Sequence, residues 1–243
     1  MTKPPSPESG EDAAGQDQGA GIRRPLHARR QGRRPRAQRQ RLFDELLPRL
    51  QPSLEAFAEP GRLFDPAPRA LRLEIGFGGG EHLLAQAAAH PGTGFIGCEP
   101  FLEGVGKALS GIAAARLSNV RIWTGDARDV LDALPDGALA RIDILFPDPW
   151  PKKRHHKRRF IGPETCSRLA RVLAPGGVLV FATDWADYAR WTLVHLARDP
   201  RFTWTARRPR DWRTAPAGHV ETRYEAKGRA AGRAITWLIF ERR

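Results

Sequence analysis

Residues 71–87 read LRLEIGFGGGEHLLAQA, and this stretch contains a complete passage from a strand through a turn into a helix. An apolar run ends at Ile75, and Gly76, Gly78 and Gly80 follow at alternate positions. Glycine lets a backbone approach a ligand closely, and the helix that follows leaves its N-terminal amide groups open to that ligand. The stretch therefore predicts one wall of a ligand site in a doubly wound α/β fold, although the glycine turn alone does not identify the ligand.

The same alternation continues along the chain. Apolar runs of strand length alternate with helical stretches, which is typical of a mostly parallel sheet with helices on both faces. We expect seven strands, near 71–75, 94–98, 120–123, 142–146, 177–183, 202–206 and 234–241. We expect helices near 42–50, 81–90, 102–116, 127–134, 163–173 and 186–197.

Three acidic side chains stand at the ends of the first three predicted strands. Glu74 and Glu99 close the first two, and Asp126 follows the third. Glu99 is placed to accept hydrogen bonds from two ribose hydroxyls, and Asp126 is placed to accept one from an adenine amine. A single acid here is also a common helix N-cap. Three acids beside the glycine turn favour a cationic cofactor, and Glu81 stands where the dinucleotide fingerprint G-x-G-x-x-G requires glycine.

A second stretch, residues 142–160, reads IDILFPDPWPKKRHHKRRF. Pro147 and Pro149 restrict the turn around Asp148, which lies where open α/β sheets bind ligands. The Lys, Arg and His residues that follow place a positive field beside this carboxylate, as suits a polyphosphate chain. An isolated basic run is more often solvated surface or a localisation signal, but its position next to the Asp-Trp pair favours a functional role.

Composition limits the class of protein. The 243 residues carry a net charge of +13, and 41% of them are hydrophobic, which is enough for a folded domain. The segment 1–41 holds ten Lys or Arg against four acids, a net +6, so the remainder is basic in its own right at +7. We expect a nucleic acid as partner.

The two cysteines, Cys98 and Cys166, lack the spacing of a metal site or a disulfide framework. We expect no bound metal. The N-terminus has no apolar core of the kind a secretory signal needs, and no stretch of the sequence is apolar over the length of a membrane span. We therefore expect a cytoplasmic protein with no membrane association.

The N-terminal 41 residues differ in composition from the rest. They are first rich in Gly, Ser, Pro and acids and then dense in arginine, so they cannot bury enough apolar surface to order alone. We expect residues 1–41 to form a disordered tail and residues 42–243 to form one catalytic domain. The arginine-rich part is either a solvated linker or an arm that orders on RNA.

Several of these motifs together resemble the bacterial tRNA (guanine-N7-)-methyltransferase family. The resemblance covers roughly residues 29–243 and lies in EIGFGGGEHL, IGCEP, GDARDVL, LFPDPWPKKRHHKRRF, ATDW and TRYEAKGRAAG. The first three are shared loosely by most class I S-adenosylmethionine-dependent enzymes, whereas PDPW with its basic run, TDW and TRYE are specific to the family. RRQGR at 29–33 is similar to the family's N-terminal segment. Two features depart from the pattern: Pro151, where many members have His, and the long N-terminal extension.

The resemblance implies a Rossmann-like class I methyltransferase fold and a set of site residues. S-adenosyl-L-methionine would be held by Glu74, Gly76, Glu99, Asp126 and Asp148, with Asp148 also the catalytic or substrate-orienting carboxylate. The tRNA would contact Lys152, Asp184, Thr222, Arg223, Tyr224 and Glu225, and RNA would also be bound by Arg154, His155, His156, Lys157, Arg158 and Arg159. The modified base would be the guanine at position 46 of the variable loop, and we expect Asp184 to face Asp148 across the pocket.

Two other interpretations compete with this one. A nicotinamide-dependent oxidoreductase fits the fold and Glu99 but not Glu81. A noncatalytic RNA-binding protein fits the charge but leaves no reason for Glu74, Asp126 and Asp148 to be present together. Whether Trp150 and Tyr224 stack on a base or only pack is open, and we expect a monomer or homodimer with no obligate protein partner.

Overall fold

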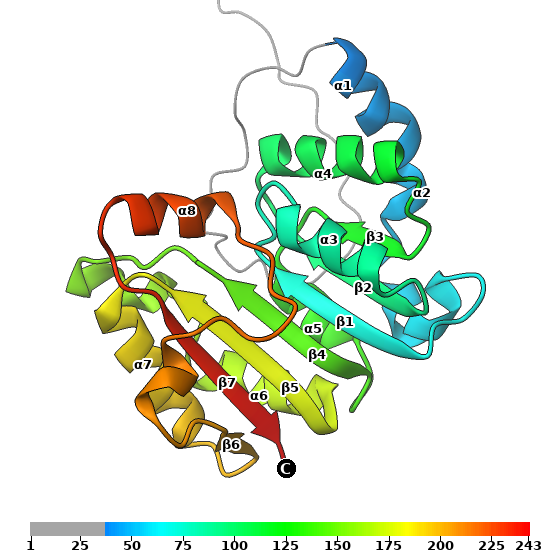
Figure 1. Ribbon diagram of the computed structural model, residues 1–243. Coiled ribbons are helices and arrows are strands. Elements are labelled where there is room, and N and C mark those ends of the chain that lie inside the picture. Colours follow the sequence, from blue (N-terminus) through cyan, green and yellow to red (C-terminus); the bar gives the residue numbers. More distant parts are fainter. Residues whose placement is uncertain (1–36) are drawn as a thin grey trace, which may run out of the picture.

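The computed structural model describes residues 37–243, and its centre is one seven-stranded sheet (Figure 1). The strand order is β3-β2-β1-β4-β5-β7-β6. The first five strands pair in parallel, and β7 runs antiparallel to both β5 and β6. The strands are β1 Ala70–Ile75, β2 Thr93–Cys98, β3 Val120–Trp123, β4 Leu139–Leu145, β5 Leu173–Thr183, β6 Phe202–Trp204 and β7 Thr236–Arg242.

Helices cover both faces of the sheet because each strand buries side chains on its two sides. On one face, Leu83, Val105 and Leu109 pack on Phe95 and Ile122. On the other face a larger core cluster joins the sheet to the helices that follow β3, β4 and β5. The α-helices are α1 Ala37–Arg41, α2 Leu47–Leu50, α3 Glu81–Ala89, α4 Leu102–Ala115, α5 Ala127–Ala133, α6 Pro163–Val172, α7 Ala186–Ala197 and α8 Arg223–Ala230.

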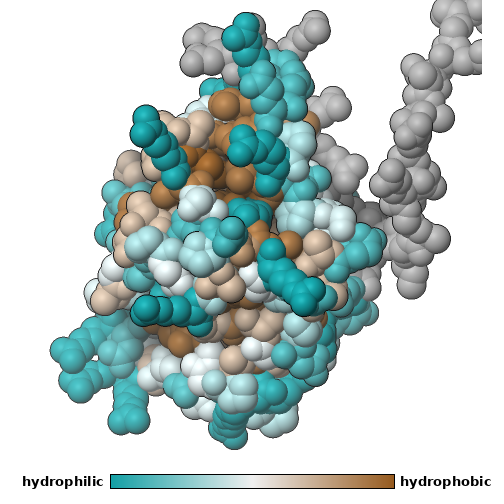
Figure 2. All heavy atoms as spheres, turned by 90° about the vertical axis from the view of Figure 1, so that its right-hand side faces the viewer, coloured by the Kyte–Doolittle hydropathy of each residue, from teal (hydrophilic) through white to brown (hydrophobic). Residues whose placement is uncertain are grey.

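Shorter helical turns complete the chain. They are the π-helical turn η1 Leu42–Leu46 and the 3-10 turns η2 Glu55–Ala58, η3 Pro60–Leu63, η4 Lys153–Arg158 and η5 Pro209–Trp212. Together α1, η1 and α2 form the opening helix, which packs against α4. Figure 2 views the face on the right-hand side of Figure 1, where hydrophobic atoms reach the surface in the upper part, between protruding hydrophilic side chains.

The structure confirms the predicted class of fold and all seven strands, with shifts of up to three residues at the ends of β4, β6 and β7 and with three larger differences. The opening helix begins at Ala37, so residues 37–41, which we assigned to the tail, are helical. The strand β5 begins at Leu173 rather than 177, because a register shift between Leu139 and Arg141 accommodates the extra residues. Helix α8 was not predicted from the sequence. Residues 1–36, including RRQGR at 29–33, lie outside the described part of the chain.

Among residues 37–243, no helix has the length and apolar character needed to span a membrane.

Candidate functional site

The main cavity lies where β1, β2 and β4 end, at the carboxyl edge of the parallel strands. It has a volume of about 640 Å³, and its walls come from the glycine turn, the ends of β2 and β3, the segment 144–160 and the start of α8. Open α/β sheets bind ligands at this edge because the loops after the strands diverge there. Both stretches singled out in the sequence therefore meet in one site.

The glycine turn forms part of one wall of the cavity. Gly76, Gly78 and Gly80 have φ values of +76°, +57° and +83°, in the left-handed region that side chains rarely adopt. A Cβ at Gly104 of α4 would lie 2.2 Å from the carbonyl oxygen of Gly78, so the turn and α4 are in direct backbone contact. The space beside Gly76 is open, since a Cβ there would meet nothing within 4 Å.

Glu99 lines this wall and is held in place by the backbone. The amide of Gly78 donates to its Oε2 at 2.8 Å, and the amide of Phe101 donates to its Oε1 at 2.9 Å. Burial raises the pKa of the Glu99 carboxyl, and these two amide bonds oppose that shift. Each carboxylate oxygen keeps a further acceptor position, so Glu99 is ready to receive hydroxyl donors from a ligand in the cavity.

Asp126 and Glu74 differ in their positions. Asp126 lines the cavity, caps α5 by accepting from the amide of Arg128, and pairs with the Arg128 guanidinium at 2.8 Å. Glu74 is not on the cavity wall: its Oε2 lies 2.8 Å from Nδ1 of buried His82 on α3. Glu74 therefore does not share the rim with Glu99 and Asp126, as we had expected, because its side chain is directed at α3. Contact between Glu74 and a cofactor stays a prediction.

Asp148 lines the cavity from the segment that follows β4, in a constrained turn. Phe146 and Trp150, two residues to either side, have φ values of +52° and +44°. Non-glycine residues hold such values only where the surroundings impose them, and they concentrate at functional sites. Burial raises the pKa of the Asp148 carboxyl, which lines the cavity together with Glu99.

The basic segment divides into exposed and buried groups. Lys157 and Arg158 line the cavity, and the Arg158 guanidinium lies 4.9 Å from the centre of the Trp150 ring. Lys152 and Arg154 are exposed to solvent, whereas His155 is partly buried and its ring packs edge-on against Trp150.

Arg159 differs from our expectation of RNA contact. Its side chain is fully buried, bonds to Asp187 of α7 at 2.5 Å and donates to the carbonyl of Pro149. His156 is partly buried, 3.7 Å from the same Asp187 carboxylate. Arg159 therefore fixes the Asp148 turn to α7, and in this arrangement its guanidinium is not available to a substrate.

The segment 222–225 provides the remaining wall. Thr222 caps α8 by accepting from the Glu225 amide, Arg223 pairs with Glu81 at 2.5 Å, and Tyr224 lines the cavity with 49% of its surface exposed. Glu225 is buried, does not line the cavity, and bonds to His219 and Arg229. Asp184 also lies outside the cavity wall and pairs with Arg233 at 2.6 Å, so the expectation that it faces Asp148 is not met.

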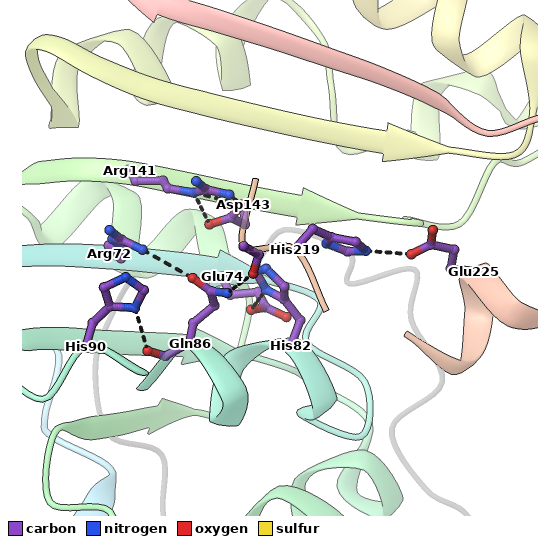
Figure 3. Close-up of polar contacts among 10 residues, drawn as sticks. Arg72, Glu74, His82, Gln86, His90, Arg141, Asp143, His219 and Glu225 are labelled. Carbon is purple, nitrogen blue, oxygen red and sulfur yellow. Dashed lines mark hydrogen bonds and ion pairs between the residues drawn. The ribbon is translucent and has the colours of Figure 1, made fainter. Parts of the chain in front are cut away.

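A buried network that the sequence did not reveal holds α8 in place (Figure 3). His219 lies 2.5 Å from Glu225, and its ring centre is 5.3 Å from that of His82. Gln86 on α3 donates to the carbonyl of Gly218 at 2.7 Å. Burial lowers the pKa of His219. Burial alone would raise the pKa of Glu225, but its bonds to Arg229 and His219 outweigh this effect, so the pKa of Glu225 is lowered. No local pattern indicates this network, since His82 and Gln86 on α3 lie far in the sequence from residues 218–225.

Among residues 37–243, no group of three or more His, Cys, Asp or Glu side chains is arranged to hold a metal ion.

The fold and this site together define the class. A seven-stranded sheet in this order, with β7 reversed and a glycine turn followed by an acid at the end of β2, is that of a Rossmann-like methyltransferase. Two solved structures share the fold: the 16S rRNA methyltransferase KamB (TM-score 0.52, 16% identity, 72% of this chain and 88% of that chain) and TrmN from Thermus thermophilus (TM-score 0.51, 21% identity, 78% of this chain and 48% of that chain).

The sequence comparisons narrow the class to a family. Residues 68–238 match a family described as putative methyltransferase. The tRNA (guanine-N(7)-)-methyltransferase of Rhodospirillum rubrum is 55% identical over 90% of this chain and 88% of its own length, and that of Nitrobacter hamburgensis is 48% identical over 88% and 85%. The chain belongs to the tRNA (guanine-N7-)-methyltransferase family. Enzymes of this class use S-adenosylmethionine.

Proposed function

We propose that this protein methylates N7 of the guanine at position 46, in the variable loop of tRNA, with S-adenosyl-L-methionine as methyl donor. The proposal draws on the names of its relatives and on a cavity that places an acidic pocket next to a cationic rim. It further holds that the enzyme acts in the cytoplasm as a monomer or homodimer without an obligate protein partner.

The donor set fits S-adenosylmethionine. Glu99 offers two fixed acceptor oxygens to the ribose, Asp126 offers an acceptor to the adenine amine, and the open backbone at Gly76 admits the ligand closely. When bound, this cofactor supplies a methyl group on a positively charged sulfur. The acids on this wall favour that charge, whereas they would repel a pyrophosphate.

Asp148 is proposed to orient the base and to stabilise its charge. Guanine N7 carries a lone pair at neutral pH, so no general base is needed and the chain must chiefly hold the reactants in line, which contributes on the order of 7–11 kcal/mol. Positive charge develops on the purine as N7 is alkylated, and a carboxylate at its edge stabilises it. The same carboxylate can accept from the guanine N1 and N2 donors, which adenine lacks in that arrangement.

The cationic rim is proposed to receive the RNA backbone. Lys157 and Arg158 line the cavity, and Lys152 and Arg154 extend the positive surface outward. Trp150 and Tyr224 both line the cavity, where a base that leaves its stack would meet aromatic surface.

The single observation that carries this proposal is the presence of Asp148, Glu99 and Arg158 on one cavity. The test is incubation of the full chain with an unmodified tRNA transcript and methyl-labelled S-adenosylmethionine, followed by nucleoside mass spectrometry and cleavage mapping. We expect 7-methylguanosine at position 46, and none in a transcript whose guanine 46 is replaced by adenine. Label at another guanine would overturn the position, and label on no nucleoside despite cofactor binding would overturn the activity.

A further inference from the structure

A second concavity lies at the far end of α8. It has a volume of about 360 Å³ and is lined by Trp212, Arg213, Arg229, Arg233 and the start of β7. None of these residues lines the main cavity, and none is among the site residues expected from the sequence, although Arg229 lies within the motif TRYEAKGRAAG. The concavity is therefore a separate feature of the surface.

Its lining is cationic and aromatic. Three guanidinium groups and one indole contribute to it, and no acidic side chain does. Arg233 pairs with Asp184 at 2.6 Å, and Arg229 pairs with Glu221 at 3.1 Å and with Glu225 at 2.7 Å. A guanidinium has five N–H donors, so each of these arginines keeps donors for another anion while its carboxylate partner fixes its direction.

Among the three arginines of this concavity, Arg213 gives the clearest indication of an external ligand. Its side chain is exposed, and it makes no ion pair or side-chain hydrogen bond with any residue of 37–243. Cations near a helix C-terminus often only complement the helix dipole, and that explanation suffices for Arg229. It does not account for Arg213, which comes from the end of η5 and joins the other two from a different element.

The position of the concavity relates it to the main site. Residue Thr236, at the start of β7, pairs with Thr183 at the end of β5, and Ala182 pairs with Leu145 at the end of β4. Two strand spacings of about 4.8 Å therefore separate the two sites along the same sheet edge, roughly 10 Å. Helix α8 links them, with Tyr224 at the main cavity and Arg229 at the second one, and Figure 1 shows it beside the ends of β4 and β5.

We propose that Trp212, Arg213, Arg229 and Arg233 form a second RNA subsite, which binds a phosphodiester of the tRNA next to the nucleotide held at the main cavity. This inference rests on the proposed tRNA substrate and extends it. The guanidinium groups bind the phosphate, and the Trp212 indole gives the adjoining sugar or base an apolar wall. The bound RNA strand runs along the sheet edge from the basic rim, over α8, to this subsite.

The test compares Arg213 with a matched arginine. Arg69 is exposed, has no side-chain partner among the described residues and precedes β1 at the opposite edge of the sheet. We would measure the affinity of the full-length Arg213→Glu, Arg213→Ala, Arg69→Glu and Arg69→Ala variants for a tRNA transcript by fluorescence anisotropy between about 50 and 200 mM salt. The same variants would be assayed for KM, kcat and S-adenosylhomocysteine affinity.

We expect Arg213→Ala to raise the tRNA dissociation constant and KM by roughly threefold at the lower salt concentration. The slope of the logarithm of the binding constant against the logarithm of the salt concentration should become shallower by about 0.7 to 0.9, the value of one phosphate contact. Arg213→Glu should weaken binding further, while kcat and S-adenosylhomocysteine affinity stay unchanged. Equal tRNA affinities for Arg213→Glu and Arg69→Glu, with methylation by the unmodified protein intact, would overturn the subsite alone. Absence of 7-methylguanosine formation by the unmodified protein would instead count against the proposed function.

Discussion

Two of the walls of the main cavity are held by different means. The wall at the ends of β1 and β2 is built from a single βα unit and its neighbour, where backbone amides of Gly78 and Phe101 fix Glu99 directly. The wall at the start of α8 is held from behind, by His219 and Glu225 and by the bond from Gln86 to Gly218, 132 positions along the chain. One wall is local and the other depends on the assembled fold, so they should respond differently to substitution.

The largest effect should come from Asp148, which lines the cavity from the segment that follows β4. Asp148→Ala removes the carboxylate that faces the developing charge, and we expect kcat to fall by roughly 10²- to 10³-fold, as for the loss of one preorganised electrostatic group. Binding of tRNA should be nearly unchanged, since the cationic rim stays in place. Asp148→Asn is the control: it keeps the size of the side chain but not its charge, so it separates the effect of lost charge from the effect of lost volume. Near-normal turnover in Asp148→Ala would contradict the proposed role.

Glu99 tests the local wall. In Glu99→Ala the ribose acceptors are lost, and the amides of Gly78 and Phe101 lose their partner. We expect S-adenosylhomocysteine to bind at least about tenfold more weakly, because loss of hydrogen bonds to a charged group costs roughly 1.5–3 kcal/mol. Isothermal titration calorimetry measures this, with tRNA affinity as the internal control. An equal loss of tRNA affinity would show that the two walls are not independent.

His219 tests the wall that depends on the fold. His219→Ala leaves buried Glu225 with Arg229 as its remaining side-chain partner and loosens the start of α8. We expect the tRNA KM to rise several-fold and the free energy of unfolding to fall by about 1–3 kcal/mol, while S-adenosylhomocysteine affinity changes little. His219→Gln retains a side-chain donor and should restore part of the loss. If cofactor affinity fell as much as tRNA affinity, the division between the walls would be wrong.

The same division explains what the sequence could predict. The strands, the glycine turn and Glu99 were predictable because their patterns lie within one or two successive elements. Helix α8 was not, because RYEAKGRA has little apolar periodicity, and its stability comes from the Thr222 cap and from buried Glu225. The burial of Arg159 and the pairing of Glu74 with His82 were missed for a similar reason: each depends on which partner tertiary packing brings to a charged side chain.

The smallest effect should appear at Asp187, which supports the Asp148 turn through buried Arg159. The hydrogen bond from Arg159 lowers the pKa of Asp187 below its usual 3.8. A depressed carboxyl pKa stabilises the fold fully at pH values above the unfolded pKa, and this contribution is lost as pH falls through the folded value. The unmodified protein should therefore lose stability relative to Asp187→Asn as pH falls below about 4.

Because 57% of the Asp187 side chain is exposed, its charge is screened, and we expect a difference of at most about 1 kcal/mol at neutral pH. Urea unfolding of the two proteins at pH 7 and at decreasing acid pH measures it, and added salt should reduce it. Asp44→Asn is the control, because among residues 37–243 this carboxylate bonds only to the side chain of exposed Gln40. A difference that stays constant to the lowest pH would mean that Asp187 acts by shape rather than by charge, so the Asp148 turn would owe its position to packing alone.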